Sequence, residues 1–238
     1  MMKVDEFVHT AVDIANHYKT LYVRSGIGYR LNNSGKSRAM QNAYNRKPER
    51  MVKIMAASSD TWAFDCSGLI KSILWGWCGD STKTYGGAVY CSNNVPDINA
   101  DTLIKKCYNV DTNMNTVQKG DLLWKPGHIG IAINKEQAVE CTPILADGVQ
   151  ITAIRNRGWQ KHGKSNYVVY SYLINEGDLV RITGDYYYNS KTRIPAWVKN
   201  KIWIVKSVSG NRILIDEDIS GRYHINSAVH KDDCELYD

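Results

Sequence analysis

Residues 64–77 read FDCSGLIKSILWGW, and this stretch decides how the first part of the chain is organised. Its large apolar residues recur at steps of one, three and four, which predicts a helix with one buried face. Gly76 marks the end of that helix. Cys66 is therefore expected in the first turn of a buried helix, where free backbone N–H groups and the helix dipole stabilise negative charge.

The flanking sequence predicts an α+β domain around this helix. Residues 4–18 have helical periodicity, with acidic residues in the first turn. Residues 78–116 are expected to be mostly loop, with one helix around 100–107. Four strands of an antiparallel meander are expected at 119–124, 128–133, 138–142 and 148–152. Helices first and antiparallel strands afterwards are typical of the α+β class.

The pattern changes after Tyr172, and a second domain is expected there. Short strands are predicted at 178–182, 203–208 and 212–216, and Ser209-Gly210-Asn211 is a tight hairpin turn. An all-β unit of about 60 residues is typical of a small barrel or sandwich. We therefore place the two domains at residues 1–174 and 175–238.

The charge is concentrated in the first domain. The chain has a net charge of +6, and residues 176–238 hold 9 basic and 10 acidic side chains. Residues 29–53 carry seven Lys or Arg and one Glu, and we interpret residues 29–61 as a long, partly helical surface excursion. An anionic polymer or a carboxylate-rich substrate would suit this charge. Nucleic acid ranks last as a partner because no recognition motif is present.

Several classes of protein and site are disfavoured by the sequence. No apolar stretch approaches the roughly 20 residues of a membrane span, and residues 1–10 show no signal-peptide pattern. The six cysteines form no CxxC pair, so free thiols and no zinc site are expected. We expect neither a metal nor another cofactor.

Three residues are candidates for nucleophilic catalysis. A thiol attacks well as a thiolate, which needs an imidazole and a polar group that orients it. His128 begins a predicted apolar strand, after a Pro-Gly turn. If the next turn spans residues 134–136, Glu140 comes opposite Gly130 and diagonal to His128; a turn one residue longer would reverse its face. The alternatives are a buried structural cysteine and a strand histidine bonded to backbone.

The order of these motifs resembles the NlpC family of cell-wall cysteine peptidases over about residues 5–170. The resemblance rests on residues 64–70, Gly120-Asp121-Leu122, the HIGI of residues 128–131 and a polar residue twelve after the histidine. It implies a papain-like core that cleaves amide bonds in peptidoglycan stem peptides. It also implies that Cys66 is the nucleophile, His128 the base and Glu140 the orienting residue, although the family more often has His, Asn or Gln there.

Four further residues are candidates for substrate binding. Tyr22, in YVRSG, resembles a family tyrosine near the oxyanion site, although Ile27 replaces the family's second glycine. Asp65 and Ser67 flank the candidate nucleophile. The second domain resembles the SH3-like wall-binding modules of phage lysins through residues 177–180, 194–198, Trp203 and 210–212, and Trp197 is its candidate contact. Residues 186–188 are tyrosines that could stack on sugar or peptide, or belong to the core.

Three functional hypotheses follow from the sequence. The first is a bacteriolytic peptidoglycan hydrolase, a phage endolysin made in the host cytoplasm without a signal peptide and released to the cell wall by a holin or by lysis. Its partner would be a Gram-positive wall. The second keeps the fold but changes the reaction to an N-acetylmuramoyl-L-alanine amidase or an acyltransferase. The third is an inactive wall-binding protein.

Overall fold

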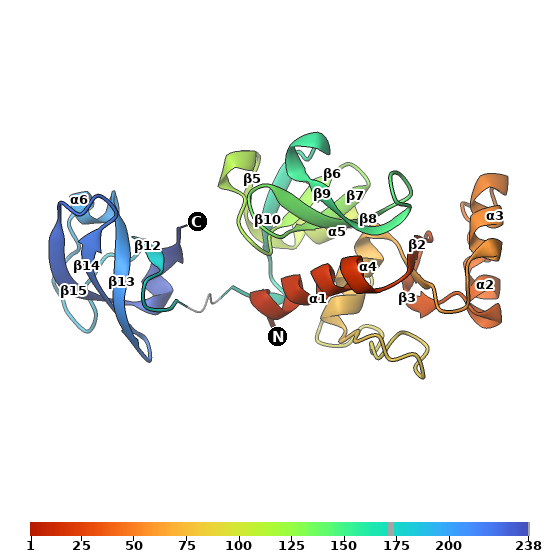
Figure 1. Ribbon diagram of the computed structural model, residues 1–238, viewed down its shortest axis with the longest axis horizontal. Helices are drawn as coiled ribbons and strands as arrows, with labels where there is room; N and C mark the ends of the chain where they lie inside the picture. Colours follow the sequence, from red (N-terminus) through yellow and green to blue (C-terminus); the bar gives the residue numbers. More distant parts are fainter. Residues whose placement is uncertain (171–173, 238) are drawn as a thin grey trace. The chain divides into compact units, whose positions relative to one another are not determined.

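The computed structural model describes residues 1–170 and 174–237, and the chain divides into two compact units, 1–170 and 171–238 (Figure 1). Ile174 packs in the core of the second unit. Within the described ranges, each helix is too short or too polar to cross a membrane. The two units are considered one at a time below.

A six-stranded antiparallel sheet forms the centre of the first unit, in the order β5-β10-β6-β7-β8-β9. Its strands are β5 (Cys107–Asp111), β6 (Leu122–Lys125), β7 (His128–Ala132), β8 (Gln137–Thr142), β9 (Gly148–Ala153) and β10 (Lys161–Ser165). Strands β6 to β9 form the meander predicted from the sequence. The prediction of loop is wrong for β5, which is an edge strand with mostly exposed residues and so lacks an apolar alternation.

Helices α1 (Val4–His17) and α4 (Cys66–Leu74) cover one face of this sheet (Figure 1). Helix α4 packs against β7 and β8, and all nine of its residues are buried. The helix begins where the sequence predicts, because Asp65 caps it by accepting a hydrogen bond of 2.6 Å from the Gly68 N–H. Residue 68 has to be glycine, because a Cβ there would lie 1.8 Å from the carbonyl oxygen of Gly26.

A second, three-stranded sheet lies at the start of α4, in the order β2-β4-β3. Its strands are β2 (Thr20–Tyr22), β3 (Ile27–Arg30) and β4 (Trp62–Phe64). The Asp65 N–H donates to the Gly26 carbonyl at 2.9 Å, and the Ser25 N–H donates to the Asp65 carboxylate at 2.8 Å. The turn between β2 and β3 is thereby held against the first turn of α4.

The basic excursion carries helices α2 (Asn33–Ala39) and α3 (Pro48–Ala56), which lie side by side at the β3 end of the unit (Figure 1). Not all side chains of this excursion are exposed. Arg50 is 5% exposed, donates to both carboxylate oxygens of Asp147 at 2.8 and 2.7 Å, and also bonds the Tyr22 carbonyl. This buried ion pair attaches the excursion to the turn between β8 and β9.

The remaining elements of the first unit are short. They are β1 (Met2–Lys3), α5 (Ala100–Lys105), the 3-10 turns Met114–Thr116 and Ile154–Asn156, and β11 (Val168–Val169), which pairs in parallel with β1. Helix α5 contacts β6 and β7, which places its first turn near the start of β7.

The second unit contains a five-stranded antiparallel sheet in the order β15-β14-β13-β12-β16. Its elements are β12 (Leu179–Ile182), α6 (Ala196–Lys199), β13 (Ile202–Ser209), β14 (Arg212–Asp218), β15 (His224–His230), the 3-10 turn Lys231–Asp233 and β16 (Cys234–Leu236). The core surrounds Trp203, which is fully buried. Over residues 174–237 the sheet is open, so the closed SH3-like barrel expected from the sequence is not found there.

Candidate active site

The candidate nucleophile lies where the helix prediction placed it. Cys66 is the first residue of α4 and is 5% exposed. Its Sγ lies 4.0 Å from the carbonyl oxygen of Gly127, and the Ile129 backbone N–H points to the same sulfur. The thiol therefore contacts the two residues that flank His128 in the chain.

The surroundings of Cys66 keep its thiol protonated at neutral pH. Burial raises the pKa of Cys66 to about 11, and the negative charge of Asp65 adds to this rise. Backbone N–H groups of Ile129 and Ser67 and the charge of Arg24 lower the pKa in part. A base must therefore remove the proton before the sulfur can attack.

His128 is the candidate for that base, and two contacts hold its ring. Its Nε2 lies 2.6 Å from Glu140 Oε2, and its ring stacks on Trp159 with centroids 5.4 Å apart and planes 10° apart. Because Nε2 is engaged by Glu140, Nδ1 is the nitrogen left to accept a proton from a thiol. The strand register is the one in which Glu140 comes opposite Gly130, since Ile131 pairs with Val139 and Ala132 with Ala138.

Glu140 is the centre of a buried polar network. It is completely buried and accepts hydrogen bonds from His128, from Thr152 Oγ1 at 2.6 Å, and from Arg157 Nε and Nη2 at 2.5 and 2.8 Å. Burial alone would raise the pKa of Glu140, but the hydrogen bonds from His128, Arg157 and Thr152 outweigh it and lower the pKa to about 2. The carboxylate is therefore ionised throughout the neutral range and can stabilise an imidazolium.

Arg157 and Thr152 were not identified from the sequence. Thr152 lies on β9 beside β8, and Arg157 follows the short turn after β9. The sequence separations from Glu140 are 12 and 17 residues, and no motif connects them. The only signal for Thr152 was the strand pairing. A residue on β9, next to β8, lies either on the face of Glu140 or on the opposite face, and the strand register decides which.

Asp101 positions the turn that precedes His128. Its Oδ1 accepts hydrogen bonds from the Gly127 N–H at 2.9 Å and from Trp124 Nε1 at 2.8 Å. Asp101 stands in the first turn of α5, so this helix fixes both ends of the turn between β6 and β7. The Gly127 carbonyl of that turn is the group that faces Cys66.

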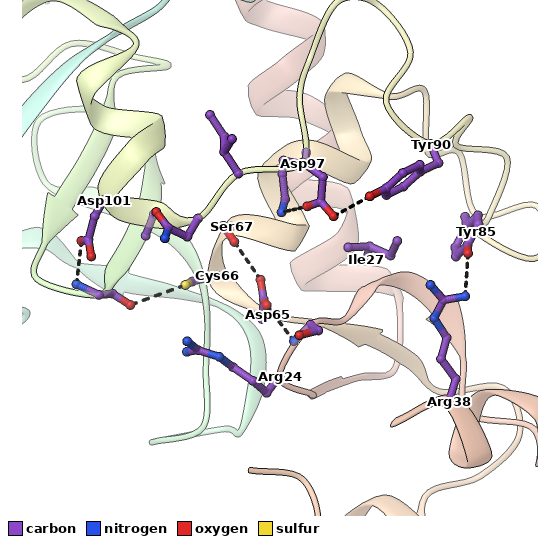
Figure 2. A pocket seen from close by; sticks show the side chains of 16 residues that line it. Arg24, Ile27, Arg38, Asp65, Cys66, Ser67, Tyr85, Tyr90, Asp97 and Asp101 are labelled. Carbon is purple, nitrogen blue, oxygen red and sulfur yellow. Dashed lines mark hydrogen bonds and ion pairs between the residues drawn. The ribbon is translucent and has the colours of Figure 1, made fainter. Parts of the chain in front are cut away.

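Cys66 opens onto a cavity of about 460 Å³ (Figure 2). Arg24 and Arg38 line one side of it, and Tyr90, Asp97 and Asp101 line another. A cavity of this size beside a thiol can hold a few residues of a peptide substrate.

Two of the four predicted substrate-binding residues line the cavity, and the other two do not. Asp65 and Ser67 line the cavity, but Asp65 caps α4 and Ser67 Oγ donates to it at 3.1 Å. Tyr22 is 5% exposed and does not line the cavity; burial raises its pKa, and its hydroxyl is bonded to Arg24. Trp197 belongs to the second unit, where it is 47% exposed. The binding roles of all four stay predictions.

Across residues 1–170 and 174–237, no group of three or more His, Cys, Asp or Glu side chains is arranged to hold a metal ion. All six cysteines are free. The geometry that is present, with Cys66 against the backbone on either side of His128 and with His128 bonded to Glu140, fits covalent catalysis by a thiolate.

Comparison with known proteins bears on this same region. Residues 55–168, a little under half of the chain, match the model of the NlpC/P60 family. The match covers Cys66, His128, Glu140 and Arg157, but it begins at residue 55, after Arg24 and Arg38. No curated protein sequence matches the chain.

Proposed function

We propose, starting from the NlpC/P60 match at residues 55–168, that the protein is a peptidoglycan hydrolase that cleaves amide bonds in wall stem peptides. The family suggests hydrolysis of peptidoglycan. The observation that carries the proposal is the hydrogen bond of 2.6 Å between His128 and Glu140, beside a thiol at the start of a helix. A structural cysteine would need no oriented imidazole at its side.

The proposed reaction uses these groups in two half-reactions. His128 Nδ1 takes the proton from Cys66, and the thiolate attacks the carbonyl carbon of the amide. The imidazolium then protonates the leaving amine as the C–N bond breaks, which leaves a thioester on Cys66. A water molecule, deprotonated by His128, attacks the thioester, and the carboxylic acid leaves as the sulfur regains its proton. Glu140 holds the imidazole and stabilises its cationic form in both halves.

The second unit is proposed to hold the enzyme on its substrate. Four of its aromatic side chains are exposed, Tyr186 at 44%, Trp197 at 47%, Tyr223 at 45% and Tyr237 at 40%. Lys201 lies over the Tyr223 ring at 3.6 Å, and Trp197 packs beside the same ring with centroids 5.9 Å apart. Exposed aromatic rings of this kind suit stacking on sugar or peptide. An SH3-like role in wall binding, in a phage endolysin released by lysis, is the function we propose for this unit.

The test compares two cysteine variants on purified cell walls. Cys66→Ala removes the proposed nucleophile and should reduce lysis to background, whereas Cys78→Ala changes an exposed cysteine and should lyse at the wild-type rate. Circular dichroism of both variants checks the fold. Lysis by folded Cys66→Ala would refute the mechanism, and an inactive wild type that still binds walls would support a binding protein. Product masses separate an endopeptidase from an amidase.

A further inference from the structure

Two arginines in the cavity beside Cys66 lack acidic partners. Arg24 and Arg38 both line the 460 Å³ cavity and a smaller adjoining cavity of about 260 Å³. Among the residues that the structure describes, neither guanidinium forms an ion pair with an aspartate or glutamate. Two less exposed arginines of this unit do form such pairs: Arg50 pairs with Asp147, and Arg157 with Glu140, whereas Arg24 and Arg38 are exposed.

Both guanidinium groups are nevertheless held in place by aromatic side chains. Arg38 Nη1 donates to the Tyr85 hydroxyl at 2.6 Å, and its guanidinium lies over the rings of Tyr29 and Tyr85 at 5.3 and 5.0 Å. Arg24 is hydrogen bonded to the buried hydroxyl of Tyr22. A guanidinium that is already positioned loses less side-chain entropy when it binds an anion.

The remaining charges of the cavity are engaged elsewhere. Lys71 is paired with Asp97, which also accepts a hydrogen bond from Tyr90. Asp101 binds the turn before His128. Asp65 caps α4 and lies near enough to Arg24 to offset part of its charge, without a direct ion pair. The charged side chains that line the cavity sum to zero, but the positive charge without a carboxylate partner lies on the side of Arg24 and Arg38 (Figure 2).

We propose that Arg24 and Arg38 form a subsite for a substrate carboxylate, so that the protein prefers wall peptides whose carboxyl groups are free to those in which they are carboxamides. The inference rests on the proposed function and names a chemical selectivity for it. A guanidinium binds a carboxylate with two parallel charge-assisted hydrogen bonds, which a neutral carboxamide cannot match. Figure 2 places Arg24 on the Cys66 side of the cavity and Arg38 on the Tyr85 side.

This inference changes the role of Arg38 from the one expected for a basic surface excursion. Exposed charges that only attract an anionic wall act at a distance and are screened by salt. Arg38 is exposed too, but its guanidinium is held in the wall of the cavity that contains Cys66. Arg46, on the same excursion, bonds the carbonyls of Met40 and Gln41 and does not line that cavity. It serves as the matched control.

The experiment measures binding separately from turnover. The full-length Cys66→Ala variant is titrated by calorimetry, at about 0.15 M salt, with a synthetic stem peptide whose carboxyl groups are free and with the same peptide fully amidated. We expect the free acid to bind about 10-fold more tightly. Adding Arg24→Gln and Arg38→Gln together should bring the two affinities within about 2-fold of each other. Adding Arg46→Gln should leave the preference unchanged.

Turnover of the same two peptides by the enzyme with Cys66 intact gives the second reading. Loss of Arg24 also removes a positive charge near Cys66 and should slow both peptides by the same factor, so the ratio of their kcat/KM values is the relevant quantity. Equal binding of the two peptides, no binding of either, or a preference that survives both substitutions would overturn the subsite. A binding preference without cleavage of either peptide would overturn the proposed function alone.

Discussion

Replacing Glu140 by glutamine should separate the electrostatic part of the His128–Glu140 interaction from its steric part. The side chain keeps its size and one acceptor oxygen, but the negative charge is lost. Two groups that rely on that charge remain, the His128 ring at 2.6 Å and the Arg157 guanidinium at 2.5 and 2.8 Å. Glu140→Ala removes the acceptor as well and leaves a buried cavity.

The expected losses follow from the partners of Glu140. A hydrogen bond to a charged group is worth about 1.5–3 kcal/mol, so weaker stabilisation of the imidazolium should lower kcat/KM by about 10- to 100-fold in Glu140→Gln. Glu140→Ala also frees the ring to rotate and should cost more. His128→Ala removes the base, a loss of about 10²–10⁴. Stability falls too, since breaking a buried ion pair costs about 3–5 kcal/mol.

The assay must therefore distinguish a slower enzyme from an unfolded one. Rates of wall hydrolysis are measured for the three variants at a temperature at which urea denaturation shows each to be folded. Asp147→Asn is the matched control, because it breaks the other buried arginine pair, with Arg50, at a distance from His128. It should lose comparable stability and retain its rate. If folded Glu140→Ala hydrolyses walls at the wild-type rate, the carboxylate does not orient His128.

Three further predictions use other parts of the structure. The pKa of Glu140 is lowered from 4.5 to about 2, so its ionised form stabilises the fold at neutral pH. This contribution is lost as pH falls from about 4.5 to 2. The melting temperature of the wild type should therefore fall more steeply over that range than the melting temperature of Glu140→Gln. Asp101→Ala should loosen the turn that holds Gly127 and reduce kcat/KM about 10-fold. Asp101→Asn keeps an acceptor, and its kcat/KM should stay within about 2-fold of wild type. Equal rates for wild type and Asp101→Ala would show that the turn holds without this carboxylate. A fragment of residues 171–238 fused to a fluorescent protein should sediment with walls, and sedimentation of only the 1–170 fragment would place wall binding in the first unit.

The position of the candidate nucleophile could be predicted from the sequence because the forces that set it are local. Asp65 caps the helix through the Gly68 N–H, three residues away, and the apolar face of α4 follows at helical spacing. The register of β7 and β8 is also set by local contacts. The Asn134 side chain accepts hydrogen bonds of 2.8 Å from the N–H groups of Glu136 and Gln137, which keeps the turn short and brings Glu140 to the face of His128.

Only the tertiary structure decided the contacts between residues that are far apart in the sequence and belong to no common periodic pattern. Arg157 reaches Glu140 from beyond β9, Asp101 holds Gly127 from α5, and Arg38 enters the Cys66 cavity from α2. Each depends on how separate elements pack, and an arginine or aspartate in a loop has the same local pattern whether it faces solvent or a cavity. The sequence by itself thus determined helix α4, the meander of β6 to β9 and the three candidate catalytic residues. Packing determined the ionisation of Glu140 and the charge of the cavity, because both arise from groups brought together across the fold.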